Sequence, residues 1–219
     1  MAAQTKPRAA VELDFAVRGA ETVAHAAVPT IAFRLAIENR GDAPVRSIVL
    51  DTQVQIAARR RSYGKREQEM LGDLFGTPDR WATTLRTLAW QRVTQPVPAF
   101  VGSPVVDLEV ACTYDFEVAA AKYLAALGDG DVPLEFQFSG TVFYGGPGGA
   151  LQTAMIGWDR EADYRLPVSV WRATMDRYFA GTAWLRLERE TFERLYAYRS
   201  RHALLSWEAA IDLLLEQQR

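Results

Sequence analysis

The spacing of apolar residues changes from a period of two to a period of about 3.6 along this chain of 219 residues. In the clearest alternating run, 106–118, apolar side chains such as Leu108 and Val110 alternate with acidic, small or polar ones. Successive side chains of a β-strand point to opposite faces, so this run predicts a strand with one buried and one solvated face. The same alternation marks segments 11–17, 31–37, 48–56 and 134–138, with a hairpin partner at 150–158. Most of the chain is therefore expected to form antiparallel sheet.

Turn residues separate these segments. A turn is predicted between two alternating runs at Asn39, Gly41 and Pro44, since Asn and Gly tolerate a positive φ and Pro blocks continued pairing. The strand–turn–strand segment 31–56 resembles that of bacterial immunoglobulin-like domains. We expect an α+β, mainly β fold: an immunoglobulin-like antiparallel β-sandwich with helical insertions and a C-terminal helical layer.

Helix-forming segments interrupt and follow the sheet. They are expected at 63–75, at 117–127, from Pro167 to Gly181 and at 190–202, with a last helix capped by Ser206. A short strand is expected at 183–187. The predicted organisation is a β-sandwich over 1–160 with a helical insertion near 63–75, and a helical subdomain over 161–219 packed on it.

Composition narrows the possible chemistry. Hydrophobic residues make up 49% and charged residues 24% of the chain, as in ordinary folded proteins. The net charge of −2 argues against a nucleic-acid or lipid surface as the main partner. The only cysteine, Cys112, falls on the apolar side of a predicted strand, so a buried thiol in a reducing compartment is expected. No targeting or membrane-spanning segment is recognisable, and we expect a soluble cytoplasmic protein.

No motif indicates an enzyme, a metal site or a cofactor. The two histidines and Cys112 do not stand at metal-ligand spacing. The glycines at 145–149 join two strand-like segments, so a hairpin loop is favoured over a phosphate-binding loop. A hydrolase or sugar-binding domain remains an alternative, which a pocket lined by Trp90, Trp158 or Trp171 with convergent carboxylates would favour.

A dense group of cations begins the predicted insertion. The basic cluster consists of Arg59, Arg60, Arg61, Lys65 and Arg66. An acidic protein surface is the preferred partner for it, with a solvated loop-to-helix junction as the alternative. We expect replacement of the three consecutive arginines with Glu to abolish partner capture without lowering stability.

An apolar cluster directly follows the basic one. It consists of Met70, Leu71, Leu74 and Phe75. If these side chains form an exposed contiguous patch, they indicate a docking surface. The alternative is an insertion packed on the sandwich. Together, the two clusters are the candidate partner-binding residues.

The C-terminal segment has a second resemblance. A short strand, a helix, a turn and a capped helix follow one another as in ribbon-helix-helix modules, which dimerise and bind DNA through the strand. Residues 183–219 contain six Arg and six acidic residues, however, a poor balance for holding phosphates. A docking or dimerisation surface is therefore favoured over DNA binding.

Several segments resemble an actinobacterial family of unknown function found beside uptake NiFe-hydrogenase genes. They are 37–41, 74–76 with Trp81, 133–144, and the tail from Trp184 to Leu215. The resemblance implies an accessory role in hydrogenase maturation or assembly, with hydrogenase subunits or maturation factors as partners and no assigned catalytic residue. A structural subunit of a larger assembly is the alternative, and the oligomeric state is left open.

Overall fold

The computed structural model describes residues 10–113, 115, 118–182 and 185–217. The chain folds as two compact units, Met1–Ala183 and Trp184–Arg219. No helix in the described ranges combines the length and the hydropathy that crossing a bilayer would need.

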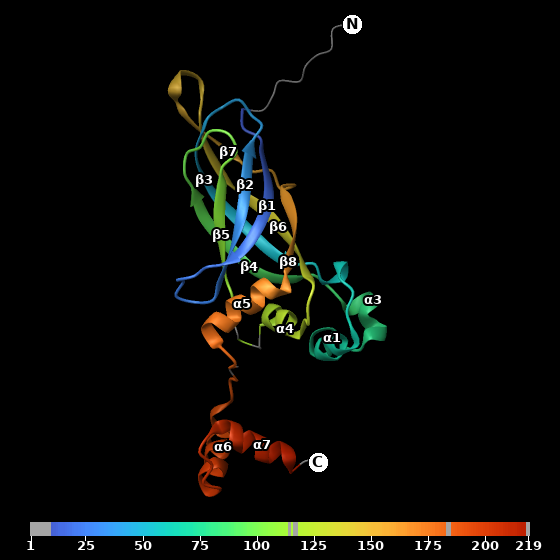
Figure 1. Ribbon diagram of the computed structural model, residues 1–219. Helices are drawn as coiled ribbons and strands as arrows, with labels where there is room; N and C mark the ends of the chain where they lie inside the picture. Colours follow the sequence, from blue (N-terminus) through green and yellow to red (C-terminus); the bar gives the residue numbers. More distant parts are fainter. Residues whose placement is uncertain (1–9, 114, 116–117, 183–184, 218–219) are drawn as a thin grey trace. The chain divides into compact units, whose positions relative to one another are not determined.

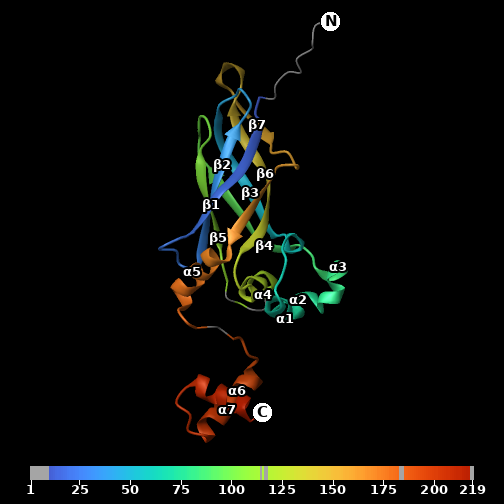
Figure 2. The same cartoon turned by 45° about the vertical axis from the view of Figure 1, so that its right-hand side comes forward.

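Two antiparallel sheets form the centre of the first unit (Figures 1 and 2). One has the order β1-β2-β5, and the other the order β4-β3-β6-β7, with β8 paired to the first half of β6. The strands are β1 (Leu13–Thr22), β2 (Thr30–Asn39), β3 (Val45–Ile56), β4 (Leu88–Val97), β5 (Val105–Ala111), β6 (Asp131–Gly145), β7 (Leu151–Met155) and β8 (Glu161–Pro167). The prediction of antiparallel sheet with helical additions is confirmed.

The apolar side of the alternating segments forms the core between the two sheets. Phe15 of β1 stacks on Phe138 of β6 with ring centroids 4.3 Å apart, and Phe33 of β2 meets Phe136 of β6 edge-on at 5.1 Å. All four rings are buried. The alternation therefore determines which face of each strand points inward.

The predicted turn after β2 is confirmed. The side-chain carbonyl of Asn39 accepts hydrogen bonds from the amides of Gly41 (2.9 Å) and Glu12 (3.2 Å), and its NH₂ group donates to the Ala43 carbonyl at 2.9 Å. A Cβ at Gly41 would lie 2.7 Å from the Cα of Val11, so glycine is required by the close approach of the backbone.

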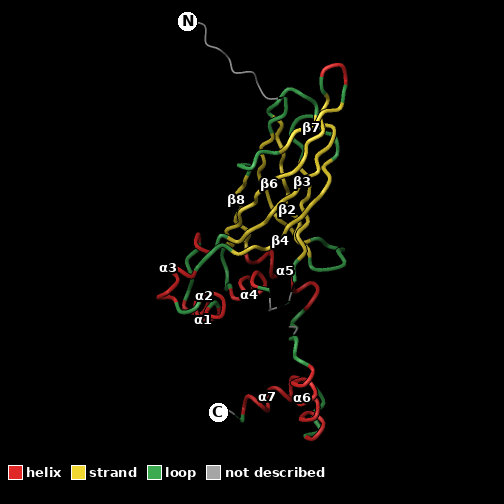
Figure 3. The backbone as a smooth tube through the Cα atoms, turned by 180° about the vertical axis from the view of Figure 1, so that it is seen from behind, coloured by secondary structure: helices red, strands yellow, loops and turns green. Residues whose placement is uncertain are grey.

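The helices of the first unit gather at one end of the strands (Figures 1 and 3). They are η1 (Ala58–Arg60), α1 (Lys65–Met70), α2 (Gly72–Phe75), η2 (Pro78–Arg80), α3 (Trp81–Thr84), α4 (Ala119–Ala126) and α5 (Val168–Phe179), and a further turn, η3 (Pro147–Gly149), lies in the β6–β7 hairpin. The predicted helices 63–75, 117–127 and 167–181 are therefore present with shorter limits. The strand expected over 106–118 ends at Ala111, and residues 114, 116 and 117 of that run lie outside the described ranges.

The division of the chain differs from the expected boundary near residue 160. Residues 161–167 form strand β8 on β6, because Glu161, Asp163 and Arg165 alternate with less polar neighbours at a period of two. Helix α5 then buries Trp171 and Met175 in the core of the same unit. The sheet unit thus extends past β8 and α5, and the units divide between residues 183 and 184. Packing of the last unit on the sheets stays a prediction.

The described part of the second unit contains two helices, α6 (Arg189–Arg201) and α7 (Trp207–Glu216). Ser206 caps α7 as predicted, since its hydroxyl accepts a hydrogen bond from the Ala209 amide at 3.0 Å. The strand expected at 183–187 is wrong for 185–187, which have no regular structure, and residues 183 and 184 lie outside the described ranges.

Candidate functional site

The connection between β3 and β4 is far longer than the sheet requires. Ile56 and Leu88 are directly paired in register, yet residues 57–87, 31 in all, lie between them. Antiparallel neighbours are commonly joined by two to five residues, and long connections within compact domains are often functional. We call residues 57–87 the insertion.

A buried ion pair holds the first part of the insertion. Arg61 and Glu67 meet at 2.7 Å, and their side chains are only 10% and 12% exposed. Arg61 also donates to the carbonyls of Asp129 and Asp131, each at 2.7 Å. Glu67 accepts from the amides of Gly64 (3.0 Å) and Gly128 (2.8 Å). The pair therefore ties the insertion to the loop before β6.

Burial and hydrogen bonding shift the pKa of Glu67 in opposite directions. Desolvation raises the pKa of this carboxyl, but the amides of Gly128 and Gly64 and the Arg61 guanidinium stabilise the charged form and together lower the pKa below its usual 4.5. Glu67 is therefore an ionised structural group.

Four aromatic rings hold the second part of the insertion. Tyr63 meets Trp81 edge-on at 5.3 Å and Tyr123 of α4 at 6.2 Å, and Phe75 lies beside Trp81 and Tyr123. The Tyr63 hydroxyl donates to the Ala58 carbonyl at 2.6 Å and accepts from the Tyr123 hydroxyl at 2.8 Å. Burial raises the pKa of both phenols. The insertion is thus packed against α4 and is not an open loop.

The structure divides the predicted basic cluster into two groups. Arg59 donates to the Leu85 carbonyl, Arg60 pairs with Glu135 and Asp163 at 2.8 Å each, and Arg61 belongs to the buried pair. These three cations are engaged within the protein itself. Replacing all three with Glu would break the Arg61–Glu67 pair, so we now expect that variant to be less stable than the wild type.

Lys65 and Arg66 form the second group. Both side chains are exposed on α1, and neither has an ion pair with any residue in the described ranges. They are therefore the two members of the basic cluster that are available to an acidic partner.

The apolar cluster also divides. Leu71 is 0% and Phe75 2% exposed, so both are core residues and cannot contact a partner, contrary to their place in the candidate set. Their spacing of four residues places them on the same buried side of the insertion. Leu74 is partly buried against that core, whereas Met70 is 60% exposed. Of the four residues, only Met70 is clearly exposed to solvent and available to a partner.

A shallow depression of about 550 Å³ lies on the insertion, with Lys65 in its lining. Its lining consists of Lys65, Gln68, Glu69, Gly72, Gly76, Thr77 and Pro78. The depression could not be identified from the sequence, because the residues from Gly76 onward are brought back to α1 only by the folded turn. With Arg66 and Met70 it forms what we call the insertion surface.

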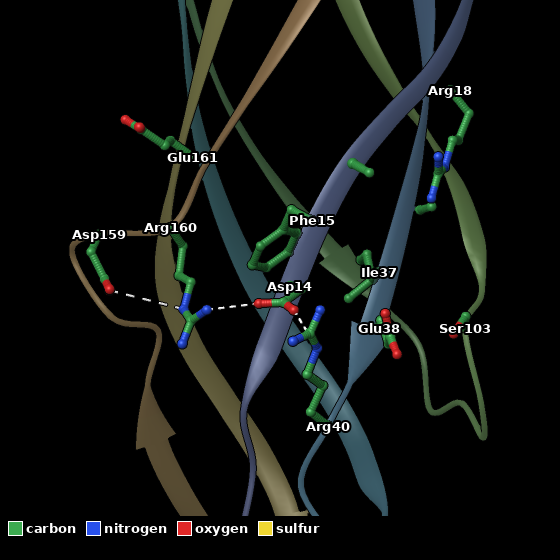
Figure 4. A pocket seen from close by; sticks show the side chains of 12 residues that line it. Asp14, Phe15, Arg18, Ile37, Glu38, Arg40, Ser103, Asp159, Arg160 and Glu161 are labelled. Atoms are coloured by element: carbon green, nitrogen blue, oxygen red, sulfur yellow. Dashed lines mark hydrogen bonds and ion pairs between the residues drawn. The ribbon is translucent and has the colours of Figure 1, made fainter.

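A second, more polar depression of about 360 Å³ lies on β1 and β2 (Figure 4). Ala16 and Ala36, paired in register, line it together with charged side chains. Asp14 lies between Arg40 and Arg160 and pairs with both, and its contact with Arg160 is 2.7 Å long. Because Arg160 follows β7, this network fastens the loop before β8 to β1.

The structure gives little support for a metal site, a reactive thiol or a sugar-binding pocket in the described part of the chain. No group of three or more metal-ligating side chains occurs within the described ranges. Cys112 is buried as predicted, and burial raises the pKa of its thiol to about 12. Trp90, Trp158 and Trp171 line neither depression. Trp158 is 95% exposed and Trp171 is buried, so the aromatic pocket expected of a sugar-binding site is not formed by them.

The fold and its surfaces define a protein of two antiparallel sheets with a structured helical insertion. The protein belongs to the family of unknown function DUF6084, whose model matches residues 10–219. The expectation of a family of unknown function that covers nearly the whole chain is confirmed. No curated protein matches the sequence significantly.

Two solved structures have a remote likeness to this protein. One is a Bordetella pertussis protein assigned as ApaA, 13% identical, with a TM-score of 0.28 over 73% of this chain and 96% of that one. The other is a β-glucosidase from Kluyveromyces marxianus, 10% identical, with a TM-score of 0.25 over 71% of this chain and 15% of that one.

Proposed function

We propose that this protein is a non-enzymatic protein-binding factor that contacts its partner through the insertion surface. One observation carries the proposal: 31 residues are placed between directly paired strands, and a buried ion pair and four packed rings hold them. A connection that served only to join β3 to β4 would need neither the length nor the internal order.

The chemistry of the insertion surface favours an acidic partner with an apolar contact. Lys65 and Arg66 present two exposed cations on α1, and Met70 adds an exposed, adaptable apolar side chain at the end of the same helix. Thioethers suit binding surfaces because they adjust to the shape of the partner. Charge complementarity would then act mainly on specificity and association rate.

The partner class that we propose is a hydrogenase subunit or maturation factor. It follows from the resemblance of the sequence to a family found beside uptake NiFe-hydrogenase genes, and it makes the protein an accessory factor in hydrogenase assembly. As part of the same proposal, the two sheets form an immunoglobulin-like sandwich that serves as a scaffold for the insertion.

Crosslinked capture from the native host, grown while it expresses hydrogenase, tests the proposal. The wild-type protein is compared with the variant K65E/R66E/M70E, which reverses two charges and removes the exposed Met without touching the Arg61–Glu67 pair. The matched control R18E/R34E/M155E makes the same kinds of change at exposed residues of β1, β2 and β7.

The expected result is that wild type and control capture a hydrogenase subunit or maturation factor, whereas the insertion variant does not. If the insertion variant captures the same partner as strongly as wild type, the insertion surface is not the contact. If none of the three proteins captures a hydrogenase component, the proposed partner class is wrong.

A further inference from the structure

The second unit has almost no core of its own. It comprises 36 residues, and among those described only Ala210 is buried. The large apolar residues that are exposed in its described part are Leu185, Phe192, Tyr196, Leu205, Ile211 and Leu215. Units below about 40 residues usually need a disulfide, a metal or an oligomeric partner to be stable. The described part of this unit contains neither cysteine nor a metal-ligating cluster.

Contacts between aromatic rings hold α6 to α7 on one side. Trp207 lies 5.4 Å from Phe192 and 6.1 Å from Tyr196, measured between ring centroids, and Arg199 lies over the Trp207 ring at 4.1 Å. Phe192 and Tyr196 are nevertheless 44% and 50% exposed. These contacts join the two helices without enclosing a core.

A groove of about 680 Å³ lies on α6, with one contribution from α7. Its lining consists of Thr191, Arg194, Leu195, Ala197, Tyr198, Arg201 and Leu214. Leu195 and Leu214 supply apolar surface, while Arg194 and Arg201 are exposed and have no ion pair with any described residue. The groove is therefore apolar with two available cations.

Helix α7 presents the complementary chemistry. Ile211 and Leu215, four residues apart, form an exposed apolar stripe. Glu208, Asp212 and Glu216, at the same spacing, form an acidic stripe beside it. The three carboxylates are exposed and have no ion pair with a residue in the described ranges.

The spacing of the charges along α6 also matches the spacing of the charges along α7. Arg194 and Arg201 are seven residues apart, about 10 Å along a helix, and Glu208 and Glu216 are eight apart, about 12 Å. A second copy of this protein therefore offers acidic and apolar stripes that fit the groove. In a two-fold arrangement each copy provides one groove and one pair of stripes, so both contacts form at once.

We propose that the second unit is a self-association module, in which the exposed stripes of α7 from one copy lie in the groove on α6 of another. The proposal goes beyond the proposed function, because it concerns other residues and another unit. An acidic helix of an unrelated protein would fill the groove but would leave Ile211 and Leu215 exposed. A second copy covers both surfaces.

Light scattering coupled to size-exclusion chromatography of the full-length protein tests this module. The wild type is expected to be a dimer. The groove variant carries R194E/R201E, and the stripe variant carries E208R/D212R/E216R. In either variant alone, like charges face each other at both symmetry-related contacts, so the dissociation constant should rise on the order of 100-fold.

Mixing the groove variant with the stripe variant is the decisive step. In the mixed pair the reversed groove of one protein faces the reversed stripe of the other, so that contact again joins opposite charges. The second contact of the mixed pair joins the unchanged groove and the unchanged stripe. A mixed dimer is therefore expected, and its formation also shows that both variants fold. The control R189E/E193R reverses two charges of α6 outside the groove lining and should dimerise like wild type.

Three results would overturn the proposal: a monomeric wild type at about 100 μM, a groove variant that dimerises as strongly as wild type, or a mixture that stays monomeric. A wild type that is monomeric alone but binds an acidic helical peptide in the groove would assign the groove to another protein. None of these results bears on capture through the insertion surface, so the two proposals succeed or fail separately.

Discussion

At the scale of single residues, Glu67 shows how one carboxylate joins distant segments. It binds Arg61 of the insertion and the Gly128 amide before β6. We expect Glu67→Gln to lower the free energy of unfolding by about 3 kcal/mol at pH 7, since the variant leaves Arg61 without its counter-charge in a site that is about nine-tenths buried. Urea unfolding of both proteins measures the difference, and an unchanged value would contradict the role of the pair.

The same carboxylate should make stability depend on pH in a defined direction. The pKa of Glu67 is lower in the folded protein than its usual 4.5. Its contribution to stability is therefore fully present above about pH 4.5 and is lost as the pH falls through the folded-state pKa, where the folded protein also binds the proton. The stability difference between wild type and Glu67→Gln should shrink as the pH falls from about 6 to about 3. A difference that grows over this range would reverse the assigned sign.

Gly140, like Gly41, stands at a position where the backbone geometry requires glycine. Its φ is +134°, and a Cβ there would collide with the Val49 carbonyl oxygen of β3. Gly140→Ala should lower the free energy of unfolding by at least about 3 kcal/mol, because it adds backbone strain and a clash within paired strands. Gly72→Ala is the control, since open space surrounds Gly72 in α2, and it should change stability by less than about 1 kcal/mol. Thermal unfolding of both variants provides the comparison.

At the scale of elements, the insertion combines a buried side with an exposed one. Phe75→Ala should lower the free energy of unfolding by about 3–5 kcal/mol, because it leaves a cavity beside Trp81 and Tyr123. Met70→Ala should change it by less than about 0.5 kcal/mol, because Met70 is 60% exposed. Equal effects of the two substitutions in urea unfolding would contradict the assignment of Phe75 to the core.

The same contrast explains what the sequence could predict of the elements. Alternation located β1, β2, β3 and β5, because inward-facing apolar residues recur at every second position over most of each strand. It did not identify β4, an edge strand in which polar residues such as Arg92 and Gln95 interrupt the apolar pattern and Pro96 lies near the end. The sequence did not predict strand β8, because helical spacing begins directly after it. The expected boundary between the sheet and the helical subdomain was therefore placed too early in the chain.

The candidate site was predictable only in part, for a related reason. Composition located the basic cluster but could not distinguish Arg61 from Lys65. The partners of Arg60 and Arg61 include Glu135, Asp163 and the carbonyl of Asp131, about 70 to 100 residues away. Such contacts depend on how β6 and β8 are placed beside η1, which local spacing does not encode.

At the scale of the whole molecule, the two units differ in how they achieve stability. The first buries aromatic and aliphatic side chains from both sheets and from α2, α4 and α5. The second buries only Ala210 among its described residues and depends on association if α6 and α7 pair with a second copy. Folding of the second unit should then be linked to protein concentration by mass action, whereas folding of the first should not.

Hydrogen exchange at two concentrations measures this difference within one molecule. When opening requires dissociation of a dimer, the open fraction varies with the inverse square root of concentration, so a tenfold increase should raise protection in α6 and α7 about threefold. Protection in β2, β3 and β6 should stay the same and serves as the internal control. If protection in α6 and α7 also stays the same, those helices are stable without a second copy. Concentration would then set only the number of dimers and not the folding of the module.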